Sequence, residues 1–194
     1  MEKAAGENAS VSIEIEKDPE TKKYIVEVKP EEGAKEAELT LDKKAVNKLL
    51  ENGASTIRME NAEGTTQADI SVKELKAALD KAPGSELIID MKEDTAPEMP
   101  ADAAEKYDVV DGGIDVIKIV LKDADGNETE VPNAKVTLKI QVEYQEGMKI
   151  MDIDAAGNAT EAETEWIAAT EDQPGYAKVV YAGYGAYLPV MPKK

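Results

Sequence analysis

The sequence predicts an α+β fold: an N-terminal sheet with two short helices, followed by an antiparallel β-sandwich. A strand-helix-strand pattern occurs twice within residues 37–92, and a segment rich in proline and acidic residues follows at 93–106. Beyond that segment, short strand-like runs alternate with turn sequences, which is typical of a sandwich. We therefore expect an α+β domain at 11–92, a linker at 93–106 and a β-sandwich domain at 107–191.

The α+β domain is expected to open with a β-hairpin. Residues 11–16 alternate strictly between apolar and polar side chains, and residues 24–28 form a second strand-like run. The polar segment between them contains Asp18-Pro19, a sequence that favours the start of a turn. The two runs therefore predict antiparallel strands with one buried face.

The doubled unit carries helix signals in both copies. In the first copy, Asp42 is a favoured N-cap residue and Gly53 ends the expected helix. In the second copy, Ser71 and Glu74 form the capping-box pattern. Apolar residues at helical spacing mark the buried side of each helix: Val46, Leu49 and Leu50 in the first, and Val72, Leu75, Ala78 and Leu79 in the second. We expect both helices to cover one face of a sheet that also includes the opening hairpin.

The second half is expected to consist of short antiparallel strands. Its clearest strand-like run, at 136–144, alternates apolar and polar residues, which predicts a strand with one buried face. Sequences rich in Asp, Gly and Asn at 123–127 and 154–158 favour hairpin turns between such strands.

The composition argues against several classes of function. The chain of 194 residues has 41 acidic and 23 basic residues, a formal net charge of -18, and its basic residues form no cluster. Phosphate contacts need such clusters, so neither nucleic acid nor an anionic lipid surface is an expected partner. The absence of His and Cys removes the commonest general base, the thiolate nucleophile and the usual zinc ligands. We therefore do not expect an enzyme.

The sequence also bears on location. No hydrophobic run approaches the length that spans a bilayer, so no membrane span is expected, and residues 1–6 lack the apolar core of a signal peptide. A chain without cysteine that acts outside the cell is more typical of Gram-positive surface proteins than of small disulfide-bonded domains. We expect an extracellular or cell-surface protein whose sequence begins after its signal.

One segment partly matches a calcium-binding loop. Its oxygen-bearing residues are Asp152, Asp154, Asn158 and Glu163, with Gly at the sixth position of the loop and a carboxylate at the twelfth. Ala156 offers no side-chain oxygen at the fifth position, however, and neither flank has a helical pattern. Two interpretations stay open: a plain hairpin turn, or a weak calcium site in a protein that otherwise needs no cofactor.

The aromatic residues are concentrated near the C-terminus. They include Trp166, Tyr176, Tyr181, Tyr184 and Tyr187. Aromatic rings exposed in a planar strip would stack on the apolar faces of sugars or on a protein partner. Alternate tyrosines would instead complete the sandwich core, which has no Phe to fill it. The two interpretations differ in whether the rings are exposed.

Carboxylate chemistry is the remaining route to catalysis. An enzyme of this kind would need a cleft that holds two Asp or Glu side chains with perturbed ionisation. With 41 acidic residues such a pair could form anywhere, so the sequence gives it no location. The absence of His, Phe and Cys is also compatible with an engineered chain, although the irregular loops argue against an idealised design.

Two stretches resemble a module of extracellular proteins from clostridia, paenibacilli and related Firmicutes, which often stands beside surface-layer homology repeats. Residues 37–92 share its doubled strand-helix-strand order with an acidic or Ser cap, and residues 114–190 share the β-rich segment that follows. The closing segment 181–187 departs from the family, because it has neither His nor Phe. The resemblance implies a non-enzymatic cell-surface or secreted protein and assigns no functional residues.

Together these observations predict a non-catalytic structural or adhesive module of a bacterial cell-surface or secreted protein. The alternative is a carbohydrate-binding module that uses the C-terminal aromatics. The expected partners are other domains of the surface protein, and a host or cell-wall protein or glycan.

Overall fold

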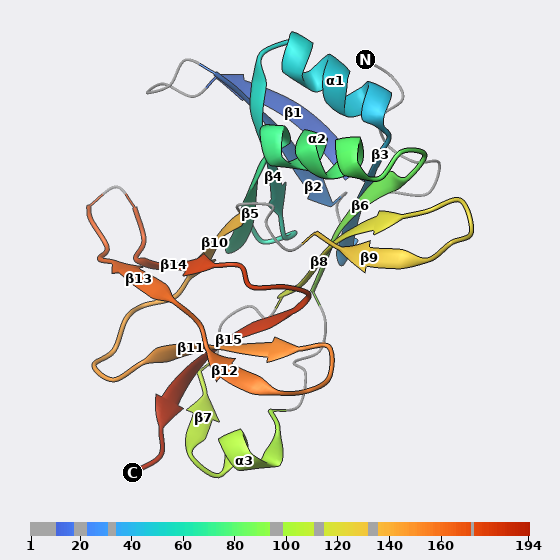
Figure 1. Cartoon of the computed structure of the whole chain (residues 1–194). Coiled ribbons are helices and arrows are strands. Elements are labelled where there is room, and N and C mark those ends of the chain that lie inside the picture. The colour runs from blue at the N-terminus through green and yellow to red at the C-terminus, as the bar shows by residue number, and fades with distance from the viewer. Residues whose placement is uncertain are drawn as a thin grey trace.

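The computed structural model describes residues 11–17, 23–30, 34–93, 99–110, 115–131, 136–171 and 173–194. In these ranges the chain forms two mainly antiparallel sheets and three helices (Figure 1). This arrangement confirms the predicted α+β fold with sandwich-like sheets. None of the helices that the described residues form is long and apolar enough to cross a membrane.

Sheet A has seven strands. Their order across the sheet is β1 (Val11–Lys17), β2 (Tyr24–Pro30), β4 (Ala54–Glu60), β5 (Thr66–Ser71), β10 (Val136–Gln141), β14 (Tyr176–Val180) and β13 (Thr164–Ile167). Strands β1 and β2 form the predicted antiparallel pair. Strands β2 and β4 run parallel, and the other neighbours in this sheet are antiparallel.

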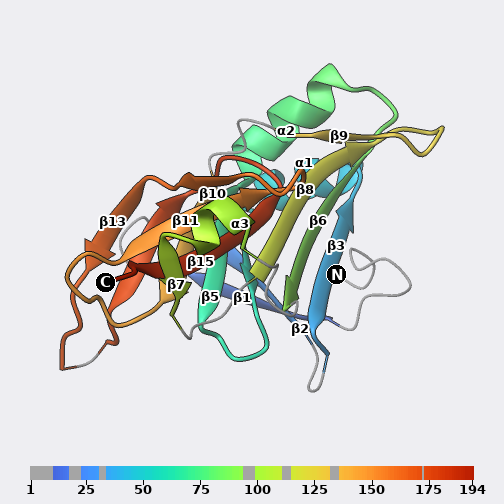
Figure 2. The same ribbon diagram turned by 90° about the horizontal axis from the view of Figure 1, so that it is seen from below.

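Sheet B has eight strands. Six follow the order β12 (Ala159–Glu161), β11 (Lys149–Asp154), β15 (Gly185–Pro192), β8 (Asp115–Lys122), β6 (Glu86–Glu93) and β3 (Glu36–Leu41). In addition, β7 (Tyr107–Val109) pairs with β15, and β9 (Glu128–Glu130) pairs with β8. Figure 2 shows β8, β6 and β3 running side by side, so β3 forms one edge of the sheet.

The doubled strand-helix-strand unit crosses from one sheet to the other. The first unit runs from β3 in sheet B through α1 (Lys43–Glu51) to β4 in sheet A. The second runs from β5 in sheet A through α2 (Val72–Lys81) to β6 in sheet B. Each unit therefore supplies one strand to sheet A and one strand to sheet B. The two strands in sheet A, β4 and β5, pair with each other, and so do the two in sheet B, β3 and β6.

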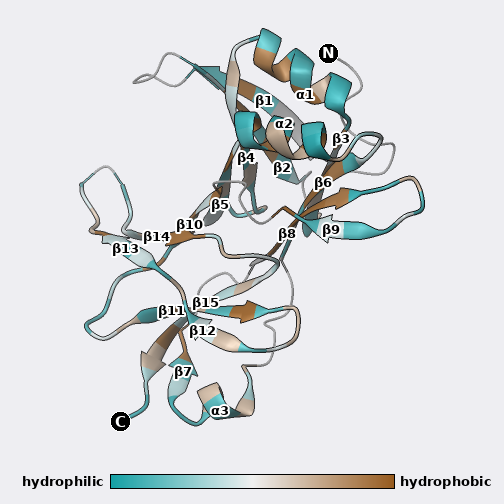
Figure 3. Cartoon of the chain, viewed as in Figure 1, coloured by the Kyte–Doolittle hydropathy of each residue, from teal (hydrophilic) through white to brown (hydrophobic). Residues whose placement is uncertain are grey.

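The helices α1 and α2 pack on each other and on strands of both sheets. Helix α1 contacts β3 and β4, and α2 contacts β4, β5 and β6. The prediction that both helices cover one face of a single sheet is therefore wrong, because each helix joins strands of different sheets. The helical spacing did identify the buried side, which includes Val46 in α1 and Val72, Leu75 and Leu79 in α2. Figure 3 shows hydrophilic and hydrophobic residues on both helices, as amphipathic helices require.

The predicted helix ends differ in how they are capped. Asp42 Oδ1 accepts a hydrogen bond from the Ala45 N–H at 2.6 Å, and Gly53 follows the helix with a φ of +82°. Both signals of the first copy are therefore confirmed. Ser71 is the N-cap residue of α2, but its side chain accepts no hydrogen bond from a helix N–H. Burial of the apolar side holds α2 in place instead.

One large hydrophobic core lies between the two sheets. Sheet A contributes residues such as Val28, Ile57 and Leu138, and sheet B contributes Leu39 and Ile119. Each of these side chains is at most 2% exposed. The residues that face away from this core form the outer faces of the two sheets.

Strand pairing crosses the expected domain boundary in both sheets. Strand β5 pairs with β10 in sheet A, and β6 pairs with β8 in sheet B. Strands from 11–92 and strands from 107–191 therefore share each sheet and the core between them. The division into an α+β domain at 11–92, a linker at 93–106 and a β-sandwich domain at 107–191 stays a prediction.

Part of the expected linker packs on the outer face of sheet B. A second apolar cluster on that face consists of Met151, Ile153, Leu188 and Val190. Met99 and Tyr107 pack against it, and Ala103 of α3 (Ala101–Ala104) is buried. Because β11 and β15 have apolar side chains on both faces, residues 99–107 are needed to keep the outer side out of water.

Candidate functional site

The structure places two of the predicted aromatic residues on opposite faces of sheet A. Trp166 lies opposite Ala177, which is fully buried in the core, so the indole ring is on the inner side. Tyr176 is the neighbour of Ala177 along β14 and therefore points to the outer face. Instead of meeting Tyr176, the ring of Trp166 packs against Tyr144, with 4.9 Å between ring centroids.

Two of the other tyrosines belong to the core. The rings of Tyr181 and Tyr187 lie 6.3 Å apart, and Tyr187 is only 2% exposed. Burial raises the pKa of Tyr187 to about 12 and holds the pKa of Tyr181 above its usual value. Tyr184 is half-buried in the turn between β14 and β15. The five predicted residues therefore do not form one exposed strip.

A hollow of about 240 Å³ lies on the outer face of sheet A, beside Tyr176. Its lining residues come from β5, β10, β14 and the adjoining turns, and include Thr65, Gln67, Lys139, Gln141, Gln173 and Tyr176. Gln141 lies opposite Tyr176 and Lys139 lies opposite Gln67 in the strand register. The hollow therefore combines one aromatic ring, one cation and three side-chain amides.

Lys139 stands between the aromatic ring and a carboxylate. Its Nζ is 5.8 Å from the centroid of the Tyr176 ring and 4.0 Å from Asp69 Oδ2. Arg58 already binds Asp69 through two bonds, from Nε to Oδ1 at 2.6 Å and from Nη2 to Oδ2 at 3.0 Å. Because Arg58 is the main partner of Asp69, the lysine ammonium is only loosely held beside the ring.

A row of charged side chains supports the hollow on its β5 side. Arg58 Nη1 donates to Glu27 Oε1 at 3.3 Å, and Lys29 binds Glu60 Oε2 at 3.1 Å. Hydrogen bonding to Asp69 and the charge of its neighbours hold the pKa of Arg58 above its usual value. Gln67 Nε2 donates to Glu60 Oε1 at 2.6 Å, which fixes the direction of that amide. Its carbonyl oxygen remains an acceptor for the hollow.

Sequence reasoning found Tyr176 but missed the glutamines. Lys139 and Gln141 are polar residues two positions apart in β10, the clearest alternating strand, so the sequence predicts that they share a face. Gln67 and Gln173 reach the hollow only because β5, β10 and β14 are neighbours. Pairing between distant strands has no local sequence signal, so these two residues could not be assigned.

The segment that resembles a calcium loop forms a hydrogen-bonded turn around Asp154. Asp154 Oδ1 accepts from the N–H groups of Ala156 and Asn158 at 2.9 and 2.8 Å, and Oδ2 accepts from Asn158 Nδ2 at 2.9 Å. These bonds lower the pKa of Asp154. Asp152 points into the core beside Tyr187, and Glu163 lies in an exposed loop. The structure therefore brings together Asp154 and Asn158 but not the other two residues.

The turn at 123–127 has the same construction. Asp123 Oδ1 accepts from the N–H groups of Asp125 and Asn127, and Asp123 Oδ2 accepts from Asn127 Nδ2. In both turns the Gly before the Asn has a positive φ, +86° for Gly126 and +81° for Gly157. The predicted hairpin turns are confirmed at both places.

Asp152 is an ionisable group inside the core. It is 9% exposed, and its Oδ1 has no hydrogen-bond partner in the part of the chain that the structure describes. Burial, with a smaller effect from the charge of Asp154, raises the pKa of Asp152 to about 6, while the hydroxyl of Tyr187 acts in the opposite direction. Burial disfavours the charged form of a carboxyl group, so Asp152 keeps its proton to a higher pH than an exposed aspartate does.

Replacing Asp152 with Asn is expected to stabilise the protein at pH 7.5 but not at pH 4. The folded-state pKa of about 6 lies above the ordinary value of 3.8, so the folded protein binds the extra proton more tightly than the unfolded chain. This carboxyl group contributes stability that is fully present below about pH 4 and is lost as the pH rises through 6, by about 2–3 kcal/mol at most. Urea unfolding of both proteins at the two pH values measures the difference. An advantage of the variant that is the same at both would contradict this account.

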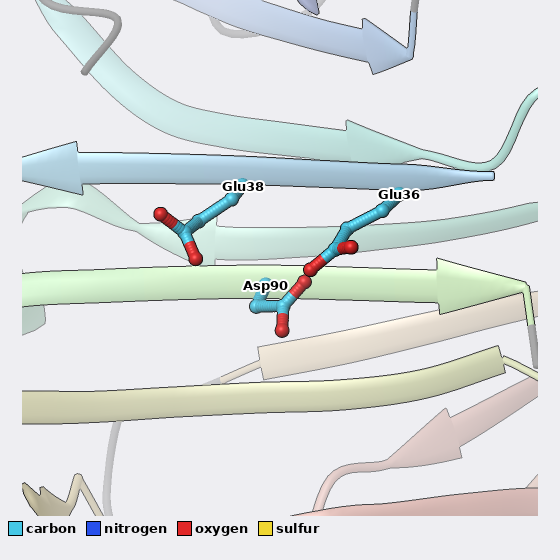
Figure 4. Close-up of side chains that lie close together, drawn as sticks. All are labelled: Glu36, Glu38 and Asp90. Carbon is cyan, nitrogen blue, oxygen red and sulfur yellow. The ribbon is translucent and has the colours of Figure 1, made fainter. Parts of the chain in front are cut away.

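Three carboxylates of sheet B lie close enough together to share a cation. Among the described residues, Glu36, Glu38 and Asp90 each offer an oxygen within 4.8 Å of the others. Figure 4 shows Glu36 and Glu38 on β3 and Asp90 on the adjacent strand β6, with the Asp90 and Glu36 carboxyl groups close together. Lys92 Nζ lies 2.7 Å from Glu36 Oε1 and 3.4 Å from Asp90 Oδ2. This set contains none of the residues that the sequence suggested as calcium ligands.

The described residues therefore form two polar arrangements on the protein surface. The hollow lies on the outer face of sheet A, and the carboxylate cluster lies on the outer face of sheet B. Each is built from side chains of neighbouring strands, so its geometry follows from the strand register. No family model, curated protein or solved structure matches this chain.

Proposed function

We propose that the chain is a non-catalytic adhesive module of a bacterial cell-surface or secreted protein, which binds a neutral carbohydrate in the hollow of sheet A. The observation that carries the proposal is the position of Tyr176 beside three glutamines, Gln67, Gln141 and Gln173. A sugar ring offers an apolar face that stacks on an aromatic ring, and hydroxyls that both donate and accept hydrogen bonds. Each side-chain amide has both a donor and an acceptor, which matches such hydroxyls.

The size of the hollow limits the bound unit. Sites for drug-sized ligands occupy roughly 300–1,000 Å³, and the hollow, at about 240 Å³, is smaller. It suits a single sugar unit, such as one residue of a longer chain that continues over the sheet surface. An adhesive module would reach useful strength by repeating such contacts along a glycan or between several copies.

The charge of the protein favours a neutral glycan over an acidic one. The chain has a formal net charge of -18, which repels polyanions at a distance. Lys139 is the cation that lines the hollow, and it already lies near Asp69 and the Tyr176 ring. The expected surface location supports the same choice, since bacterial surface modules meet glycans of the cell wall and of the host.

Binding to a glycan array should depend on Tyr176. We expect the wild-type protein to bind neutral glycans and Tyr176→Ala to bind at least about tenfold more weakly, since truncating an aromatic hot-spot residue costs about 2 kcal/mol or more and each ~1.4 kcal/mol is a factor of ten. Tyr144→Ala is the matched control, because Tyr144 is 50% exposed but packs against Trp166, away from the hollow. It should bind as the wild type does.

Two results would overturn the proposal. One is a wild-type protein that binds no glycan on the array, which would leave a purely structural role. The other is a glycan whose binding is lost in Tyr144→Ala and kept in Tyr176→Ala, which would move the site to the inner edge of sheet A.

A further inference from the structure

The carboxylate cluster on sheet B has the geometry of a ligand set. Glu36 and Glu38 alternate along β3 and so point to the same face, and Glu38 lies directly opposite Asp90 of β6. The three side chains therefore lie on the same face of the sheet, as Figure 4 shows. We infer that Glu36, Glu38 and Asp90 form a calcium-binding site that joins the edge strand β3 to β6.

Asp90 gives evidence for a ligand that is independent of the number of acidic residues. It is only 8% exposed, yet its Oδ1 has no hydrogen-bond partner among the described residues. A buried carboxylate oxygen without a partner is costly, and native structures usually pair such an atom with a donor or a cation. Asp90 stands in the cluster beside the two glutamates, so a cation bound to them would reach it.

The charges of the cluster leave room for a divalent cation. When ionised, the three carboxylates carry three negative charges, and Lys92 supplies one positive charge through its contacts with Glu36 and Asp90. The next lysine on this face, Lys118, is paired with Glu128. A doubly charged ion would therefore bring the cluster to neutrality. The Lys92 side chain is 43% exposed, so it can turn towards solvent to admit the ion.

The open position of the cluster on a sheet face favours Ca²⁺ over Mg²⁺. The ligand atoms lie within 4.8 Å of one another and come from three side chains on two strands. Ca²⁺ accepts oxygen ligands in a flexible geometry, whereas Mg²⁺ demands near-ideal octahedral geometry and is reluctant to lose its waters. With three carboxylates on an open sheet face, water would fill the other positions. Affinity in the range of extracellular calcium modules, about 0.1–1 mM, is expected.

Thermal unfolding with and without calcium tests the site. About 10 mM CaCl₂ should raise the melting temperature of the wild-type protein by about 3–10 °C, and the same concentration of MgCl₂ should raise it less. The shift should be lost in Glu38→Gln, a change of an exposed side chain that leaves folding intact, and in Asp90→Asn. Glu63→Gln is the matched control, because Glu63 is an exposed acid in a turn of sheet A.

The melting temperature of each variant is compared with and without calcium, so a change in the stability of the calcium-free variant does not affect the result. A wild-type protein that does not respond to calcium would overturn the inference. An equal response in Glu38→Gln and Asp90→Asn would do the same, because it would show general screening of a protein with a net charge of -18. The hollow lies on the other sheet, so the outcome is independent of the glycan-binding proposal.

Discussion

Replacing Arg58 with Met is expected to lower the free energy of unfolding by about 2–4 kcal/mol, because it leaves two carboxylates without their main partner. Arg58 bridges Glu27 and Asp69 on the outer face of sheet A, and the Arg58 and Glu27 side chains are only 16% and 6% exposed. Removing the cation leaves Glu27 with the contact to Lys29 at 3.4 Å and Asp69 with the contact to Lys139 at 4.0 Å. A charge that is only weakly compensated at a poorly hydrated place is destabilising even when the pair itself contributes little.

Lys178→Met on the same face is the matched control. Lys178 pairs with Glu165, but the two side chains are 47% and 63% exposed, so water screens both charges. This substitution should change the free energy of unfolding by no more than about 0.5 kcal/mol. Urea unfolding at neutral pH measures both variants. Equal effects would show that burial of Glu27 and Asp69 does not govern the energetics of this face.

Gly185→Ala is expected to destabilise the protein by about 3 kcal/mol or more, or to prevent folding. A Cβ atom at this position would lie 2.4 Å from the backbone oxygen of Ile153 and 3.0 Å from Asp152 Oδ1. The Ile153 oxygen belongs to the β11 backbone, which pairs with β15 along the whole of β11, so it cannot move without breaking that pairing. Overpacking at a rigid place is costly because no side chain can rotate away.

Gly64→Ala is the matched control, because it replaces a glycine without bringing the new Cβ atom into a steric clash. Gly64 has a φ of +69°, and no atom of the described residues lies within 4 Å of its expected Cβ. Alanine there should cost only the penalty of a left-handed backbone, roughly 1–2 kcal/mol. Thermal unfolding of the two variants gives the comparison. If Gly185→Ala were no worse than Gly64→Ala, the close approach of β11 and β15 would not be a constraint on the fold.

The sequence predicted those parts of the fold that depend on neighbouring residues. The Asp42 cap, the Gly53 helix end and the two hairpin turns at 123–127 and 154–158 all follow from contacts within a few residues. The α+β class could also be predicted, because the alternating and helical patterns are local properties of the chain.

The arrangement of the sheets depends on distant pairs and could not be predicted. Nothing in the doubled unit indicates that β3 and β4 belong to different sheets, because the sequence pattern of a strand does not specify which strand it pairs with. The same limit affected the candidate sites. Trp166 and Tyr176 are near each other in the sequence, but the register of β13 and β14 places them on opposite faces. Asp90 meets Glu38 only through the pairing of β3 with β6.

Chemical-shift mapping of isotope-labelled protein with a panel of neutral oligosaccharides tests the central claim most directly. The account predicts that a bound sugar changes the amide signals of Gln67, Gln141 and Tyr176, which line the hollow on three neighbouring strands. Signals on the outer face of sheet B should stay unchanged. A panel that changes no signal, or changes only those around Tyr144 and Trp166, would contradict the claim that the hollow of sheet A is a carbohydrate site.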